Sequence, residues 1–406
     1  MIISTETIQF IHTHINDDVR TLALGKHPAG VDLRTALVQI SGYQYALSKL
    51  PEWAATDGIL WPEHISLEQC TSQLLAQYKA RIVDRLLRPG FSMADLTGGL
   101  GVDCLYLSRN AGRLCYNDAN PELAELVGHN LPLLGRSDIA VSAGTAENFL
   151  SEHSGERFGL IYIDPSRRSS GGRKLVSLKD CMPDVTELQH RMSSMADYVI
   201  VKMSPMLDIS VVLSELRNVR ELWALSLDGE CKELMAVIQH DCQYEAEIVA
   251  ADITSDGTDS GYIRSTLSRE SSLPLPLLPE DVPMEGKYLY EPSAAYMKSG
   301  LYRTLCHKYG LCQLHVNSHL YISDTYIKDF PGRRFGIISV FTFDKRSSRQ
   351  LFAEHSQANI TTRNFPLTAG ELRNRYNVAD GGPYYIFATT VFPDRKVLIM
   401  TMRPSE

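Results

Sequence analysis

The spacing of apolar residues changes near residue 88. Before that point apolar side chains recur every three or four positions, as in "DLRTALVQISGYQYALSKL", which is typical of amphipathic helices. The clearest such stretch is "ISLEQCTSQLLAQYKARIVDRLL", where Ser66 and Gln69 predict a capping box at the start of one long helix. We expect residues 1–88 to form a helical packing layer with no chemistry of its own.

From residue 89 to about residue 270, short strand-like runs alternate with helical runs. The strand-like runs include "SMADL", "RLCYND", "IAVSAG", "GLIYID" and "DYVIVKM". This alternation predicts an α/β domain with a parallel sheet and helices on both faces. Ligands of such sheets bind beyond the carboxyl ends of the strands, so residues that follow each strand are the candidates for chemistry.

The last third of the chain predicts two small α+β modules. The segment "SSLPLPLLPEDVP" holds four prolines and is a linker candidate. After it, residues 281–330 have a strand, helix, strand, strand pattern. Residues 331–406 combine "FGIISVFTF", "YYIFATTVF" and "KVLIMTMRP" with a helix-like "TAGELRNRYN".

The composition is that of a globular protein, and its charge is unevenly distributed. The chain has 406 residues, 44% hydrophobic and 22% charged, with a formal net charge of −8. Residues 331–406 nevertheless hold eleven Lys or Arg and six Asp or Glu, a charge of +5, which favours nucleic-acid contact there. Six aromatic residues lie among these cations and could stack on bases, although we expect at least half of them to be buried. They are Phe343, Phe352, Phe365, Tyr376, Tyr384 and Tyr385.

Other sequence features favour a cytoplasmic protein without a metal or a membrane segment. The eight cysteines form no C-x-x-C pair and no zinc-like cluster, which favours reduced thiols. The N-terminal residues lack the pattern of a secretory signal, and no apolar run approaches the ~20 residues that span a bilayer.

A glycine-rich turn follows the first predicted strand, in "DLTGGLGVDCLYLS". Asp95 ends the strand, and Gly98, Gly99 and Gly101 would let the backbone approach a ligand, or would simply make a tight turn. Asp118 ends the next strand, 20 residues after Gly98, where a carboxylate can bind a ribose hydroxyl pair.

Enzymes that use NAD and enzymes that use S-adenosylmethionine share this arrangement, and two details favour the second. The third glycine of the dinucleotide motif G-x-G-x-x-G would fall at Cys104 and is missing. Asp95 would repel a pyrophosphate, whereas it suits the positive charges of S-adenosylmethionine.

The third predicted strand leads into Thr145-Ala146-Glu147. The Ala146 N–H group could bind an adenine ring nitrogen, and Glu147 could lie near the exocyclic amine. Glu147 is about as well explained as an acidic residue that stabilises a helix N-terminus.

The fourth predicted strand leads into "IYIDPSRRSSGGRK". Asp164 lies at the carboxyl end of the sheet, and Pro165 fixes the backbone so that carbonyl groups can point into a site. Hydrogen bonds from a substrate amine to Asp164 and to a carbonyl of this loop would hold that amine for methylation. The cations that follow, Arg167, Arg168, Arg173 and Lys174, form either a phosphate clamp or a solvated basic loop. Lys202, after the fifth strand, could contact substrate or pair with a nearby carboxylate.

Four motifs in order, "DLTGGLGVD", "YNDANPELAELVGHN", "GTAENFL" and "IDPSRR", resemble those of class I methyltransferases. The fourth is similar to the D/N-P-P-Y or D-P-P-R motif of enzymes that methylate exocyclic amines of nucleic-acid bases, with Ser166 in place of the second proline. Asn130 resembles an asparagine often found in RNA methyltransferases. The segments "EQCTSQLLAQYKA", "YLYEPSAAYMKSGL" and "RRFGIISVFTFDKR" make the whole chain similar to a Bacteroidetes-type class I methyltransferase with a THUMP-like C-terminal domain.

This resemblance implies an α/β fold: a Rossmann-like methyltransferase sheet at 89–270 after the helical region, a ferredoxin-like domain at 281–330 and a THUMP-like, RNA-binding domain at 331–406. With the motifs above, it gives the residues expected to contact S-adenosylmethionine: Asp95, Thr97, Gly98, Gly99, Gly101, Asp103, Asp118, Ala119, Ala146, Glu147 and Asp164. Asp164 and Pro165 are the expected catalytic residues, and the expected substrate contacts are Ser166, Arg167, Arg168 and Lys202.

The expected function is methylation of an exocyclic amine of an RNA base, with tRNA or rRNA as the partner. A methyltransferase for DNA, protein or a small molecule, with the tail as an interaction module, is the alternative. A binding protein without activity is a third reading, against which the acids at positions 95, 118 and 164 argue.

Overall fold

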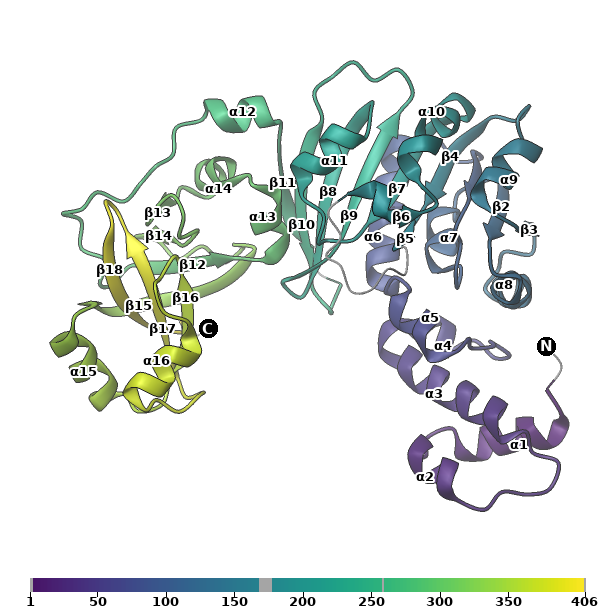
Figure 1. The fold of residues 1–406 in the computed structure, drawn as a ribbon, viewed down its shortest axis with the longest axis horizontal. Coiled ribbons are helices and arrows are strands. Elements are labelled where there is room, and N and C mark those ends of the chain that lie inside the picture. The colour runs from purple at the N-terminus through teal and green to yellow at the C-terminus, as the bar shows by residue number, and fades with distance from the viewer. Residues whose placement is uncertain (1–2, 168–176, 258, 405–406) are drawn as a thin grey trace. The chain divides into compact units, whose positions relative to one another are not determined.

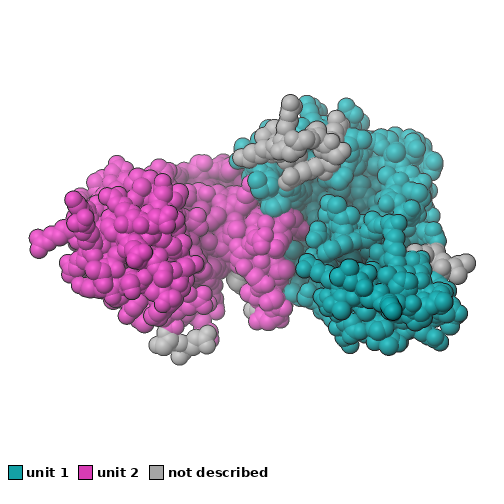
Figure 2. All heavy atoms as spheres, turned by 60° about the horizontal axis from the view of Figure 1, so that its bottom comes forward, with its two compact units in different colours: residues 1–220, 234–244 teal, residues 221–233, 245–406 magenta. Residues whose placement is uncertain are grey.

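The computed structural model of the chain describes residues 3–167, 177–257 and 259–404 (Figure 1). The chain divides into two compact units, coloured separately in Figure 2. Unit 1 is Met1–Arg220 with Leu234–Tyr244, and unit 2 is Glu221–Glu233 with Glu245–Glu406. Each unit has its own cavity, and each is described by itself below.

Unit 1 begins with helices, as the periodicity predicted. They are α1 (Thr5–His14), α2 (Val19–Leu24), α3 (Leu33–Lys49), α4 (Pro51–Ala54), α5 (His64–Gln69) and α6 (Gln73–Leu86). The predicted single long helix is wrong, because the chain breaks between α5 and α6. Ser66 lies inside α5 rather than at its N-cap, so the capping box is absent. At the break, Cys70 is extended, and the Thr71 hydroxyl donates a hydrogen bond to Asp103 at 2.6 Å.

The sheet of unit 1 has the strand order β9-β7-β4-β1-β2-β3. Five neighbouring strands are parallel, as predicted, and β9 pairs antiparallel with β7. The bounds are β1 (Ser92–Asp95), β2 (Arg113–Asp118), β3 (Ile139–Ala143), β4 (Phe158–Ile163), β7 (Ala196–Met203) and β9 (Glu230–Gln239, of which the first four residues belong to unit 2). The strand order runs outward in both directions from β1 and β4, and their carboxyl ends are where such sheets bind ligands.

Helices connect these parallel strands. They are α7 (Val102–Leu107), α8 (Pro121–Leu133), α9 (Ala146–Glu152) and α10 (Val185–Met195), and α11 (Ile209–Glu215) follows β7. The central strand β4 is buried along most of its length: Leu160, Ile161 and Ile163 are fully enclosed. Such a continuous apolar run is typical of a parallel strand that is covered on both faces. A small two-stranded ladder follows, formed by β5 (Ser166–Arg167) and β6 (Cys181–Met182), with η1 (Leu178–Asp180) just before β6.

Unit 2 contains the rest of the chain and a second sheet, with the order β13-β14-β12-β15-β18-β17-β16. Its first elements are β8 (Val219–Leu227, of which all but two residues belong to this unit), β10 (Glu247–Ile253), β11 (Asp259–Ser265) and α12 (Leu267–Ser272). Next come β12 (Tyr288–Pro292), α13 (Ala294–Ser299), α14 (Tyr302–Tyr309), β13 (Cys312–Gln313) and β14 (Tyr321–Ser323). The last elements are β15 (Gly332–Thr342), α15 (Lys345–Glu354), β16 (Asn359–Arg363), α16 (Ala369–Tyr376), β17 (Tyr384–Val391) and β18 (Arg395–Met402).

The six aromatic residues of residues 331–406 are less buried than we predicted. Only Phe352 is fully buried, and the other five are half-buried. All five nevertheless pack against two apolar clusters to which this module contributes. A module of about 70 residues has too much surface for its volume to enclose every large ring. These rings therefore contribute to packing, which limits their use as stacking platforms.

Candidate functional site

A cavity of about 400 Å³ lies at the carboxyl ends of the parallel strands of unit 1. Its volume falls within the range of small-molecule sites in proteins. Its walls come from the segments after β1, β2, β3 and β4, and from Lys202 on β7. Eleven of the predicted site residues line it: Thr97, Gly98, Gly99, Asp103, Asp118, Ala119, Ala146, Glu147, Asp164, Ser166 and Lys202.

The glycine-rich turn is shaped by close contact with β2. A Cβ atom on Gly98 would lie 2.0 Å from the Tyr116 ring, so only glycine fits at this position. The Gly98 N–H donates to the Asn117 carbonyl at 2.9 Å, and the Tyr116 hydroxyl donates to the Gly99 carbonyl at 2.6 Å. Gly99 faces open space, with no atom within 4 Å of where a Cβ would be. The turn is therefore fixed on its inner side and accessible on the side of the cavity.

Asp118 fastens the end of β2 to this turn. One carboxylate oxygen accepts the Gly99 N–H at 2.8 Å, and the other accepts the Asn120 N–H at 2.8 Å. A carboxylate has about four acceptor sites, so these two bonds leave acceptor capacity on the side that lines the cavity. Asp118 is thus oriented in advance to accept hydrogen bonds from a ligand.

Asp95 is completely buried and does not line the cavity. One of its oxygens accepts the Thr97 N–H at 3.1 Å, and the other has no hydrogen-bond partner among the described residues. Burial raises the pKa of Asp95 well above its ordinary value, and the nearby acids Asp103, Asp118 and Asp164 raise it further. A buried carboxyl oxygen without a partner is costly, and a ligand with a donor or a positive charge would suit it.

Asp164 is held at its backbone and at its side chain. Its N–H donates to the Thr97 hydroxyl at 2.7 Å, and its carboxylate accepts a hydrogen bond from the Lys202 ammonium at 2.6 Å. Lys202 was expected either to contact substrate or to pair with a carboxylate, and in the structure it pairs with Asp164. About a third of the Asp164 side chain stays exposed, so the pair lies at the surface of the cavity.

Asp103 joins this pair to the N-terminal helices. It forms an ion pair with Lys79 of α6 at 2.8 Å and lies 4.0 Å from the Lys202 ammonium. The hydroxyl groups of Thr71 and Tyr162 also donate to it, at 2.6 and 2.7 Å. Burial alone would raise the pKa of Asp103, but Lys79 and Lys202 outweigh burial and lower it to about 2. A chain of alternating charges therefore runs from fully buried Lys79 to Asp164.

The remaining predicted residues differ in what they contact. Ala146 and Glu147 begin α9, where the Thr145 hydroxyl caps the helix by accepting the Asn148 N–H, so Glu147 lies both in the first helical turn and in the cavity wall. Gly101 has a φ of 84° and begins α7, and it does not line the cavity. Pro165 is buried behind the wall.

The basic loop after Pro165 is described only at its start. Ser166 lines the cavity from β5. The backbone of Arg167 pairs with Cys181 in the β5–β6 ladder. The Arg167 side chain and the whole of Arg168, Arg173 and Lys174 lie outside the described residues, so their role as a phosphate clamp stays a prediction.

The N-terminal helices also contribute to this site, which the sequence pattern did not predict. Ser66, Gln69, Cys70 and Thr71 line the cavity from α5 and the break before α6. The expectation of a packing layer without chemistry was therefore too narrow. The only local signal was the polar run "EQCT" inside an otherwise regular apolar stripe. Burial raises the pKa of the Cys70 thiol to about 11, so it is not a ready nucleophile.

Asn130 has a structural role in this molecule. It is fully buried on α8, and its side chain exchanges two hydrogen bonds with the Leu60 backbone, at 2.9 and 2.8 Å. It thereby attaches the segment before α5 to the α/β sheet layer.

Among the described residues, no helix is long and apolar enough to cross a bilayer.

Two family models match the last part of the chain. Residues 288–331 match a ferredoxin-like domain, and residues 332–403 match a THUMP-like domain. Both matches lie within unit 2.

Relatives with a similar arrangement span most or all of the chain. A crystal structure of a "putative methyltransferase" from Porphyromonas gingivalis W83 is 30% identical, with a TM-score of 0.86 and 100% of both chains covered. Two curated proteins of Mycobacterium tuberculosis, from strains CDC 1551 / Oshkosh and ATCC 25618 / H37Rv, are named uncharacterized S-adenosylmethionine-dependent methyltransferases. Each is 25% identical over 348 residues, which is 84% of this chain and 85% of the relative.

Proposed function

We propose that this chain methylates an exocyclic amine of an RNA base. It belongs to the family of S-adenosylmethionine-dependent methyltransferases with ferredoxin-like and THUMP-like C-terminal domains. The observation that carries the proposal is the position of Asp164. Its carboxylate is oriented by Lys202 in the wall of a cavity that also contains the glycine turn and Asp118. Alone among the acids of this wall, Asp164 begins the motif that resembles those of amine methyltransferases.

The residues of this cavity fit S-adenosylmethionine. Asp118 has acceptor capacity for two ribose hydroxyls, and the turn at Gly98 and Gly99 gives the methionine part a close approach to the backbone. The unpartnered oxygen of Asp95, buried behind this turn, is available to accept a hydrogen bond. Ala146 and Glu147 are available for the edge of the adenine ring.

When bound, S-adenosylmethionine supplies a methyl group attached to a positively charged sulfur. The protein must present the lone pair of the acceptor nitrogen and accept the N–H bonds of that amine. Asp164 can accept one such bond, and the ion pair with Lys202 holds its carboxylate in place. The Thr97 hydroxyl fixes the Asp164 backbone at 2.7 Å, and Pro165 restrains the chain beyond it. In this scheme Lys202 is a positioning residue, and positioning provides most of the rate acceleration.

RNA is the substrate that the rest of the chain favours. The THUMP-like match covers 332–403, within the segment of charge +5. An excess of Lys and Arg attracts the phosphate backbone, and THUMP-like domains imply RNA binding. Methylation of DNA, protein or a small molecule by the same cavity is the competing outcome.

The test is transfer of tritium-labelled methyl groups from S-adenosylmethionine to RNA, DNA and protein purified from a strain that lacks this gene. We expect label in RNA. Label in protein or DNA alone would contradict the RNA assignment. Calorimetry with S-adenosylhomocysteine should show binding in the same preparation, and no binding would contradict the assigned cavity.

A further inference from the structure

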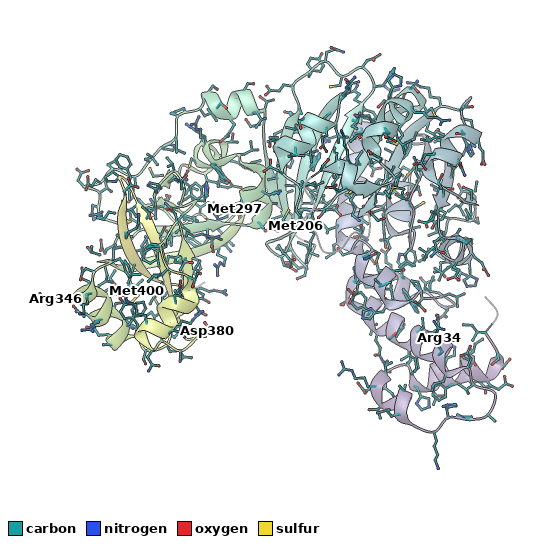
Figure 3. The ribbon with its side chains drawn as sticks, in the orientation of Figure 1. Arg34, Met206, Met297, Arg346, Asp380 and Met400 are labelled. Atoms are coloured by element: carbon teal, nitrogen blue, oxygen red, sulfur yellow. The ribbon has the colours of Figure 1, made fainter. Side chains whose placement is uncertain are left out.

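A second cavity, of about 1190 Å³, lies entirely within unit 2. Its lining includes the end of β12, the start of β15 and the end of β16, and Met297 of α13 (labelled in Figure 3). It therefore combines residues of the ferredoxin-like match and of the THUMP-like match. The methyl-transfer scheme above uses none of them.

One buried carboxylate organises the cations of this cavity. Glu291 at the end of β12 is 3% exposed, and it pairs with both Arg333 and Arg363. Arg333 is its direct neighbour across the β12–β15 ladder. Arg363 donates from Nε and Nη2 to the other Glu291 oxygen, at 3.2 and 2.9 Å. A buried acid that binds two guanidinium groups leaves a local excess of one positive charge.

The pairing with Arg363 requires a strongly curved sheet. β12 and β16 are separated by three strands in the sheet order, which would place them about 19 Å apart in a flat sheet. The contact at 2.9 Å shows that the sheet curls until the end of β16 reaches β12. Gly332 permits the close approach at the start of β15: its φ is 147°, and a Cβ atom there would lie 2.2 Å from the Glu291 carbonyl oxygen.

Both arginines keep donors that face away from Glu291. Each uses only its Nε and Nη2 atoms on the carboxylate, and within the described part of the chain neither Nη1 group has another partner. Their side chains are 46% and 43% exposed. A guanidinium that is already oriented loses little entropy when it binds a second planar acceptor such as a phosphate.

Further cations line the same cavity. They are Arg334, whose guanidinium is held by the Lys328 carbonyl, together with Lys328 and Lys298. Four acids line the cavity as well, Glu291, Asp228, Asp252 and Asp329, so its five cations leave a net charge of +1. Asp252 accepts the Gly229 N–H at 3.0 Å, and Asp228 accepts the Ser255 N–H at 2.8 Å. The arrangement of arginines around Glu291 is therefore the part of this cavity that is prepared for an anion.

We infer that this cavity binds backbone phosphates of the RNA substrate, with Arg333 and Arg363 as the central contacts. The inference rests on the proposed function, because RNA is the phosphate-bearing partner that this function requires. Arg334 on β15 and Lys328 in the segment before β15 are further cations of the same cavity. The two modules then form one RNA-binding element, in which Glu291 orients the arginines and does not itself contact the RNA.

The test uses the full-length protein and the double variant Arg333→Ala/Arg363→Ala. A matched control, Arg346→Ala/Arg349→Ala, removes the same charge from α15 in the same module (Arg346 is labelled in Figure 3). Binding to a labelled single-stranded RNA 20-mer, and to the DNA of the same sequence, is measured as a function of salt. Loss of two phosphate contacts should lower the salt slope by about 1.4 and weaken RNA binding by about tenfold. The control should change RNA binding less than about twofold.

The inference would be overturned if both double variants weakened RNA binding equally, or if Arg333→Ala/Arg363→Ala did not weaken it. Binding of inorganic phosphate at these arginines, without RNA binding that depends on them, would also overturn it. S-adenosylhomocysteine calorimetry on each variant separates this result from the proposed function, because the cavity of unit 1 is unchanged. Methyl transfer to RNA at an unchanged KM in Arg333→Ala/Arg363→Ala would contradict the phosphate site while supporting the proposed function. RNA binding that depends on the arginines, with no methyl transfer to RNA by the wild type, would support the site and contradict the function.

Discussion

The two cavities use charge in opposite ways. In unit 1, acids at strand ends face a cavity of about 400 Å³, and they pair with fully buried Lys79 and with Lys202, whose side chain is 12% exposed. In unit 2, one buried acid holds two half-exposed arginines beside a cavity of about 1190 Å³. The first arrangement suits a small, enclosed ligand that carries positive charge, and the second suits a larger anion. In each cavity, the charges that stay exposed thus indicate the charge of the ligand that fits.

The largest expected effect is at Asp164. Asp164→Ala removes the acceptor for the substrate amine, and we expect methyl transfer to fall by about 10²–10⁴-fold. Binding of S-adenosylhomocysteine should change little, because the turn and Asp118 are intact. The control Asp241→Asn, at an exposed position of the same unit, should retain activity. Transfer by Asp164→Ala at the wild-type rate would remove Asp164 from catalysis.

Lys79→Met tests whether the charges of unit 1 are structural. The substitution leaves buried Asp103 with two hydroxyl donors and, among the described ion pairs, the more distant Lys202 at 4.0 Å. Breaking a buried pair from one side should lower the free energy of unfolding by about 3–5 kcal/mol. Arg363→Ala in unit 2 removes a half-exposed partner and leaves Arg333 on Glu291, so its cost should stay below about 1 kcal/mol. Chemical denaturation measures both, and similar costs would contradict the contrast between the cavities.

Gly98→Ala tests the shape of the turn. The added methyl group would overlap the Tyr116 ring, which should destabilise the protein by about 1–3 kcal/mol. S-adenosylhomocysteine binding should weaken as well, because the turn must shift. Gly155→Ala is the matched control in the same unit, since a Cβ there meets no atom within 4 Å and its φ is not positive. A normal affinity in Gly98→Ala would show that the turn does not shape the site.

The smallest expected effect is a pH dependence that originates at Asp95. Its folded pKa is raised by burial above the ordinary 3.8, so the folded state keeps a proton that the unfolded chain releases. Stability from this group therefore falls as pH rises from about 4 toward the folded pKa. Asp95→Asn has no proton to release, so its unfolding free energy relative to wild type should rise across that window. Asp103 does not interfere there, because its pKa is lowered to about 2 and its contribution is lost only in stronger acid. If the difference in unfolding free energy between Asp95→Asn and the wild type stays constant with pH, the raised pKa of Asp95 is contradicted.

The sequence predicted those parts of unit 1 that depend on local pattern. Parallel strands end at the predicted acids, and the glycine turn between Asp95 and Asp103 is where the alternation placed it. Eleven predicted residues share one cavity because the carboxyl ends of neighbouring parallel strands meet at one edge. The same logic explains Asp118, whose spacing from Gly98 follows from one helix and one strand.

Contacts between distant segments could not be predicted in this way. Thr71 reaches Asp103 across 32 positions, and Glu291 reaches Arg363 across 72 positions. Both contacts depend on how helices or curved strands pack, and hydrophobic periodicity carries no information about that. The capping box failed because α5 begins at His64, two residues before Ser66, and element boundaries are poorly determined by local pattern.

The central claim is that the acids of unit 1 serve methylation of RNA that is held by the arginines of unit 2. The most direct measurement is mass spectrometry of nucleosides from tRNA and rRNA of a strain that lacks this gene. The strain is complemented with the wild type, with Asp164→Ala or with Arg333→Ala/Arg363→Ala. We predict that one base methylated on an exocyclic nitrogen disappears on deletion, returns with the wild type, stays absent with Asp164→Ala and returns only in part with the arginine variant. An unchanged set of methylated nucleosides in the deletion strain would contradict the account.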